Sequence, residues 1–169
     1  MSERRDTEYV EYVSSRLSWL RRVAFLLCQD WHTADDLVQA TVTRLFTRWP
    51  RAQRADNLDA YVRTILVRIF IGERRSGWGK RVVLPGFTPE SYAHVADRDA
   101  VLDVRDALAT VPPRQRATLV LRFYCDLDVE QVAAALDCSA GTVKSQTAKG
   151  LAAMRRALDP SEPGIRRGI

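Results

Sequence analysis

The chain has little cysteine and little histidine, with three and two of these residues among 169. Cys28, Cys125 and Cys138 are odd in number and far apart, and His32 and His94 complete no metal-ligand pattern with them. A disulfide framework and a zinc site of ordinary spacing are therefore excluded, and we expect no cofactor. We interpret the cysteines as reduced thiols of a cytoplasmic protein.

Long apolar runs are also missing. No stretch reaches the roughly 18 apolar residues of a transmembrane helix, and the N-terminal MSERRDTEYVEY lacks the apolar run of a signal peptide. We therefore expect no membrane insertion. Hydrophobic residues nevertheless make up 46% of the chain, which excludes general disorder, and the length allows one medium domain or two small ones.

Lysine is scarce, because Lys80, Lys144 and Lys149 are the only lysines among 26 basic residues. The rest are arginines, whose planar forks suit phosphates and base edges better than an ammonium group does. The net charge is +5, and residues 44–81 hold ten basic residues against three acidic ones. This local excess indicates a polyanionic partner, the alternative being a solvated helical surface.

What the sequence does contain is helical periodicity. An apolar stripe from Tyr9 to Leu27 predicts a first amphipathic helix. A second is predicted to begin with Thr33 as N-cap, to continue its apolar stripe through Val38, Val42, Leu45, Phe46 and Trp49, and to end at Pro50.

A third helix is predicted from about Leu58 to Arg75, with Val62, Ile65, Leu66 and Ile69 as its core stripe. Away from that stripe, basic and bulky apolar groups alternate, a pattern that suits bases and phosphates together. One such face carries Arg63, Val67, Phe70 and Arg74, and the next carries Thr64, Arg68, Ile71 and Arg75.

Between about residues 76 and 98 the pattern gives way to glycine and proline, which predicts a linker. Helical patterns resume at about 100–110, 114–124, 129–136 and 139–158. We therefore predict an all-α protein with two small helical domains joined by a flexible linker. The N-terminal helical bundle spans 1–80, the linker 81–99, a C-terminal helix-turn-helix domain 100–159 and a tail 160–169.

The stretch DCSAGTVKSQTAKG, residues 137–150, resembles a phosphate-binding loop in composition. Such a loop needs a Gly-rich turn between a strand and a helix, with Gly directly before the Lys, whereas Val143 stands there and the preceding EQVAAALD is typical of a helix. A nucleotide hydrolase is therefore disfavoured. A helix-turn-helix explains the same residues better.

In that interpretation Val132, Ala133 and Leu136 face Val143 and Leu151 across the two helices. Asp137 occupies a turn that favours a left-handed backbone, and Ser139 caps the second helix. The outer face of the second helix is small and cationic: Gly141, Ser145, Ala148 and Ala152, flanked by Thr142, Lys144 and Lys149. The alternative is the polar face of an ordinary helical hairpin.

Four segments together resemble the extracytoplasmic-function (ECF) sigma factors of bacterial RNA polymerase, most closely the SigE-like actinobacterial branch. These segments are TADDLVQATVTRLFTRW, the Arg-rich AYVRTILVRIFIGERR, the Pro/Gly linker, and the block from VPPRQRATLVLRFYCDL to GTVKS. The resemblance covers about residues 8–158. It implies that the N-terminal domain is sigma region 2, which binds core polymerase and melts the minus-ten element. The C-terminal domain is then region 4, which binds the minus-35 element.

The resemblance also implies roles for individual residues. Asp36, Gln39 and Thr43 match the polymerase-facing helix. The minus-ten and melting set comprises Arg54 and Asn57 in a base-capturing loop, then Arg63, Arg68, Phe70, Arg74, Arg75 and Trp78. The minus-35 set comprises Ser139, Gly141, Thr142, Lys144, Ser145, Gln146 and Lys149.

The chain departs from the family pattern at Arg68, Gly72, Gln146 and Thr147, where the family often has Asn, an acid, Arg and an apolar residue. The leading hypothesis is a sigma factor that is not an enzyme. Its partners would be core RNA polymerase, duplex and single-stranded promoter DNA, and, as a further candidate, an anti-sigma factor. The alternative is an autonomous helix-turn-helix regulator.

Overall fold

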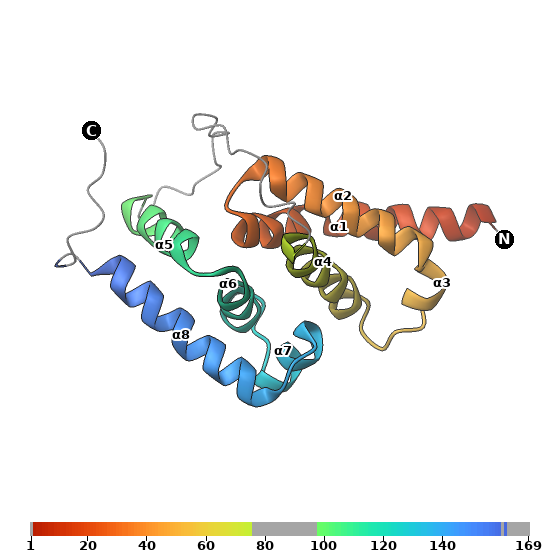
Figure 1. Ribbon diagram of the computed structural model, residues 1–169. Helices are drawn as coiled ribbons and strands as arrows, with labels where there is room; N and C mark the ends of the chain where they lie inside the picture. Colours follow the sequence, from red (N-terminus) through yellow and green to blue (C-terminus); the bar gives the residue numbers. More distant parts are fainter. Residues whose placement is uncertain (1, 76–97, 160, 162–169) are drawn as a thin grey trace. The chain divides into compact units, whose positions relative to one another are not determined.

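The computed structural model describes residues 2–75, 98–159 and 161, with the side chains of 2–72, 103–159 and 161. All regular structure in these ranges is helical (Figure 1). The helices divide into two compact units, 1–81 and 82–169, so the predicted all-α class with two small helical domains is confirmed. The predicted linker lies almost wholly outside the described ranges.

The first unit contains α1 (Ser2–Cys28), α2 (Trp31–Thr47), the short α3 (Trp49–Ala52) and α4 (Leu58–Arg75). Helix α2 packs against both α1 and α4. The core between them is aliphatic, because Leu20, Leu27, Leu37, Leu45 and Leu66 are fully buried. This burial, more than intrinsic helix propensity, stabilises the unit.

Helix α2 begins and ends earlier than predicted. Its N-cap is Asp30 and not Thr33: the Asp30 Oδ2 accepts hydrogen bonds from the backbone N–H of Thr33 at 2.8 Å and from its hydroxyl at 2.7 Å. Burial raises the pKa of Asp30, but these hydrogen bonds and the neighbouring His32 together outweigh burial and lower the pKa overall. Pro50 lies in the first turn of α3, where a missing N–H costs nothing, so it does not end α2.

Some apolar assignments in this unit were wrong, and Leu17 of the predicted first stripe is 41% exposed. Phe46, predicted in the core stripe of α2, is 45% exposed and meets the Tyr9 ring edge-on at 5.1 Å. Val67 and Phe70, predicted to stand away from the core, are buried. Because helix α4 packs against α1, α2 and α3, its buried surface is wider than one stripe.

The second unit contains α5 (Arg98–Thr110), α6 (Pro113–Leu119), α7 (Val129–Leu136) and α8 (Ala140–Leu158). A π-helical turn, Val120–Tyr124, extends α6, so the helix predicted over 114–124 is present with a wider last turn. Helix α8 packs against the other three helices of this unit. At Gly150 the approach is close, because a Cβ there would lie 3.0 Å from the Leu119 side chain.

A buried arginine joins α5 to α6. Arg116 donates to the carbonyl oxygens of Leu108 at 3.1 Å, Ala109 at 3.0 Å and Val111 at 2.9 Å. Leu108 and Ala109 belong to the last turn of α5 and Val111 follows it, a place where helix geometry leaves carbonyls short of backbone donors. The Arg116 guanidinium therefore closes α5, and it is buried there.

No helix among the described residues combines the length and the apolarity needed to span a membrane.

Candidate nucleic-acid interface

Helices α7 and α8 are joined by a turn of residues 137–139. Asp137 has a φ of 52°, the left-handed conformation predicted for it, and its N–H donates to the Ala133 carbonyl. Ser139 is the N-cap of α8, and its hydroxyl accepts from the Thr142 N–H at 3.1 Å. Residues 129–158 thus form the predicted helix-turn-helix, and the turn follows helix α7, whereas a phosphate-binding loop would follow a strand.

The outer face of α8 is as open as its sequence predicts. Gly141, Lys144, Ser145 and Lys149 are exposed, while Thr142 and Gln146 are half-buried. On the inner side, Val143 and Gly150 are buried and Leu151 is half-buried. A helix whose inner side is packed against its own domain and whose outer side is small and cationic can enter a major groove and contact phosphates.

Thr147 lies on the inner flank of α8, a position where an apolar side chain would pack without needing a hydrogen bond. Its hydroxyl donates to the Val143 carbonyl at 2.7 Å, one turn back along the helix. The half-buried hydroxyl is therefore satisfied locally, which explains how the helix accepts a polar residue at this position.

Replacing Asp137 with glycine is expected to stabilise the C-terminal unit by roughly 0.5–1 kcal/mol, because glycine adopts a left-handed backbone without the Cβ penalty. Removing a negative charge from the C-terminal end of α7 acts in the same direction. Chemical denaturation of the full chain, followed by circular dichroism, measures the change. Asp137→Asn separates the two effects, since it removes the charge and leaves the strain; a glycine variant no more stable than the parent would contradict the strain argument.

The predicted minus-ten and melting residues are distributed over α4 and the loop before it. Arg54 and Asn57 are exposed in the loop, and Arg68 is exposed on α4. Arg74 and Arg75 belong to the last turn of α4, but their side chains lie outside the described ones, as does all of Trp78.

Arg63 and Phe70 face a different environment from Arg68. The Arg63 guanidinium lies over the Trp19 ring, 5.9 Å from its centroid, and its Nε is buried with no hydrogen-bond partner among the residues that the structure describes. Phe70 is only 4% exposed. In the free chain both side chains therefore contribute to packing, and an aromatic platform at Phe70 is not open to a base.

The predicted polymerase-facing residues lie on one face of α2. Asp36, Gln39 and Thr43 are three and four residues apart, the spacing that puts side chains on the same side of a helix. Gln39 and Thr43 are exposed and Asp36 is half-buried. The helix therefore presents a polar surface opposite buried Leu37, Val38 and Leu45.

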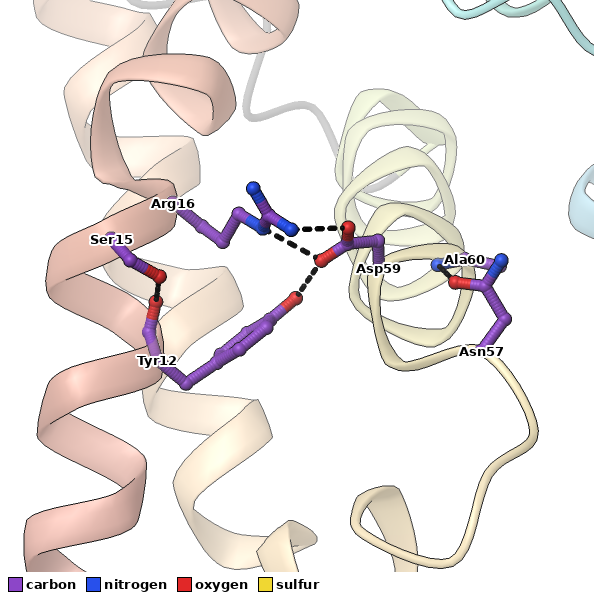
Figure 2. Close-up of polar contacts among 6 residues, drawn as sticks. All are labelled: Tyr12, Ser15, Arg16, Asn57, Asp59 and Ala60. Atoms are coloured by element: carbon purple, nitrogen blue, oxygen red, sulfur yellow. Dashed lines mark hydrogen bonds and ion pairs between the residues drawn. The ribbon is translucent and has the colours of Figure 1, made fainter.

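The first turn of α4 contacts α1 through polar side chains that the sequence analysis did not single out (Figure 2). The Tyr12 hydroxyl donates to Asp59 Oδ1 at 2.7 Å, and the Arg16 guanidinium contacts both Asp59 oxygens, each at 2.9 Å. Burial, and next the hydrogen bond to Asp59, raises the pKa of Tyr12 well above its ordinary value. The only sequence signal was that Tyr12 and Arg16 are four residues apart on one helix.

Beside this contact is an open hollow of about 500 Å³, lined in part by Glu8, Tyr12, Trp49 and Gln53. The Gln53 amide donates to Glu8 Oε2 at 2.7 Å, so this end of α1 also holds the start of the loop before α4. Carboxylates in the lining disfavour a phosphate group inside the hollow.

The exposed cationic face of α8 in the helix-turn-helix and the basic first unit are features of a DNA-binding protein. Family comparison agrees: residues 12–79 match the model of sigma-70 region 2, and residues 102–154 match that of sigma-70 region 4. The chain belongs to the ECF-type sigma factors of RNA polymerase, and it is similar to members of the SigE-like branch.

The relatives cover most of the chain. It is 37% identical to the RNA polymerase sigma-E factor of Streptomyces coelicolor, over 89% of this chain and 86% of the relative. It is 36% identical to the Streptomyces avermitilis sigma-E factor, over 90% and 86%. The fold is similar to that of the sigma factor RpoE of Bartonella quintana, solved in complex with the anti-sigma factor NepR. That match has a TM-score of 0.72 and 23% identity, and covers 92% of this chain and 99% of the other.

Proposed function

We propose that this protein is a transcription initiation factor that binds core RNA polymerase, recognises promoter DNA and opens it, without enzymatic activity of its own. It works in the cytoplasm, where polymerase acts. Residues 1–80 bind polymerase through Asp36, Gln39 and Thr43 and melt the minus-ten element. Residues 81–99 link this part to residues 100–159, which bind the minus-35 element, and residues 160–169 form a tail.

The observation that carries the proposal is the outer face of α8. Lys144 and Lys149 flank the small exposed residues Gly141 and Ser145, so that the helix backbone can approach base pairs while the ammonium groups reach phosphates. Ser139, Thr142 and Gln146 add hydrogen-bonding groups near the N-terminal end of α8, the end that contacts bases in most helix-turn-helix proteins.

Melting is assigned to the first unit. Arg54 and Asn57 lie exposed in the loop before α4, Arg68 is exposed on that helix, and Arg74 and Arg75 fall in its last turn. Binding of unpaired bases and of the strand's phosphates offsets the cost of unpairing, so melting needs no nucleotide hydrolysis.

An anti-sigma factor is a further proposed partner. The Bartonella quintana sigma factor of similar fold was solved with an anti-sigma factor bound to it. A second structural neighbour is the PhyRSL–NepR complex from Sphingomonas sp. Fr1, with a TM-score of 0.61 and 20% identity. Both complexes were observed for those other proteins. They support the proposal because this chain has a similar fold.

The decisive experiment is reconstitution with core RNA polymerase of a Streptomyces species, followed by co-purification and run-off transcription on fragmented genomic DNA. We expect a stable complex and transcripts whose start sites share minus-35 and minus-ten elements. Absence of binding to core polymerase would overturn the proposal. Specific duplex binding by the protein alone, unchanged by polymerase, would favour an autonomous regulator.

A further inference from the structure

Asp59 joins two parts of the first unit. It lies in the first turn of α4, and its carboxylate is held by Tyr12 and Arg16 of α1, as Figure 2 shows. The Tyr12 side chain is half-buried and its hydroxyl stays protonated, so it is a permanent donor to Asp59. The first turn of α4 is therefore fixed against α1 by a phenol and a bidentate guanidinium.

The same turn of α4 carries the end of the exposed loop. Asn57 is the residue before α4, and its Oδ1 accepts the N–H of Ala60 at 3.0 Å (Figure 2). Because a backbone N–H can only donate, the side-chain atom facing it must be the oxygen. The Asn57 amide nitrogen is thereby left as an exposed donor, and its direction is set by the position of the α4 turn.

Stability alone is a weak reason for the contact between Asp59, Tyr12 and Arg16. The Arg16 and Asp59 side chains are 45% and 36% exposed, and ion pairs of such exposure contribute about 0–1 kcal/mol. The position of the contact is more informative. Asp59 lies two residues after Asn57, so the contact holds the turn from which the Asn57 side chain projects.

We propose that Asp59, through Tyr12 and Arg16, is a positioning residue that holds the loop of residues 54–57 in the form that receives an unpaired promoter base. Asn57 and Arg54 then present donors, which can hydrogen-bond to acceptor atoms on the edge of that base. A loop ordered before binding loses less conformational freedom when the base enters. This inference rests on the proposed function, since it concerns how the same site takes single-stranded DNA.

The chain offers a matched control. Arg21 of α1 pairs with Asp35 of α2 at 2.6 and 3.1 Å, and these side chains are 44% and 49% exposed. Like Asp59 and Arg16, they form a bidentate contact from α1 to a neighbouring helix. No loop residue of the predicted DNA-binding set adjoins Asp35, so Asp35→Asn removes a comparable ion pair without touching the loop.

The test uses holoenzyme and a fluorescent single strand carrying the minus-ten sequence found by run-off transcription. Asp59→Asn is expected to weaken binding of this strand by about 5- to 10-fold, and Asp35→Asn by less than about twofold, a contrast expected if preorganisation of the loop matters. Tyr12→Phe, which keeps the ring and removes one donor, is expected to fall between them. Binding to core polymerase is expected to stay unchanged in all three.

A second measurement separates positioning from a general structural role. An abasic site introduced in turn at each position of the strand identifies the captured base, which should cost the parent holoenzyme about 10-fold, in the range of one stacked base. In Asp59→Asn this penalty is expected to shrink to less than about threefold, because a misplaced loop no longer contacts the base.

The outcomes are distinguishable. If the parent binds the strand and Asp59→Asn keeps the full abasic penalty, the positioning role is wrong while the proposed function stands. If the parent holoenzyme neither transcribes nor binds the strand, the proposed function itself fails. If Asp59→Asn lowers the melting temperature more than Asp35→Asn does, the abasic penalty is measured in Tyr12→Phe instead. A full abasic penalty in Tyr12→Phe also overturns the inference.

Discussion

Arg116→Met is expected to unfold the C-terminal unit at temperatures where the first unit remains folded. The substitution keeps an unbranched apolar stem but removes the donors to the carbonyls of Leu108, Ala109 and Val111. Hydrogen bonds from a charged donor contribute about 1.5–3 kcal/mol each, and the buried Val111 carbonyl, left without this donor, adds to the loss. We expect a destabilisation of about 3–5 kcal/mol, a large fraction of the stability of so small a domain.

The sequence contains an internal reporter for this experiment. All four tryptophans, at positions 19, 31, 49 and 78, fall within residues 1–81 of the first unit. Tryptophan fluorescence of the full chain should therefore show an unchanged transition, while circular dichroism loses helical signal more than about 10 °C earlier, in line with the shift such an energy produces in a domain of this size.

Arg114→Met is the matched control, because Arg114 belongs to the same VPPRQR segment and is only half-buried. We expect its thermal transition to stay within a few degrees of the parent. Equal transitions for the two variants would show that Arg116 does not hold the end of α5. An early loss of tryptophan signal in Arg116→Met would contradict the assignment of its effect to the second unit.

The combined Lys144→Gln and Lys149→Gln variant is expected to lose minus-35 binding strongly at moderate salt. Each lysine that neutralises a DNA phosphate releases a counterion, so removing both should flatten the slope of log affinity against log salt by about 1.8. Charge reversal to glutamate should deepen the loss at every salt concentration. Holoenzyme binding to a duplex with only the minus-35 element, measured over a salt series, gives the slope.

The other end of the same helix supplies the control. Arg155 and Arg156 lie in the last turn of α8 and are exposed. Changing both to glutamine removes the same charge from the same helix, away from the N-terminal half that faces DNA in the proposal. An equal change of slope in both double variants would show a general charge effect and would contradict the assignment of Lys144 and Lys149 as phosphate contacts.

Local rules in the sequence were enough to predict several details of the helix-turn-helix. The apolar spacing located α7 and α8, Asp137 was predicted in a left-handed turn, and Ser139 was predicted as a cap; the structure confirms all three. These features depend on residues within one or two turns of each other, so short-range geometry determines them. Helix α4 was likewise predicted over its full range, Leu58–Arg75.

Periodicity failed where several neighbours cover one helix. The spacing on α4 predicted Phe70 and Val67 beside exposed arginines, yet both are buried, because contacts with three other helices widen the buried surface. Capping failed in a similar way at α2, where Asp30, three residues before Thr33, accepts from its N–H and thereby moves the start of the helix. A periodic pattern identifies the apolar face of a helix, but it does not show how many other helices will pack against that helix.

By itself the sequence determined most of the helices, the division into two small helical domains and the cationic outer face of α8, because each follows from spacing and charge along a continuous stretch of chain. Only the tertiary structure decided that Arg116 closes α5 and that Asp59 meets Tyr12 and Arg16. The contact of Asp59 with Tyr12 joins residues 47 positions apart in sequence. Such contacts exist only after the helices have packed, and no local pattern records which side chains packing will bring together.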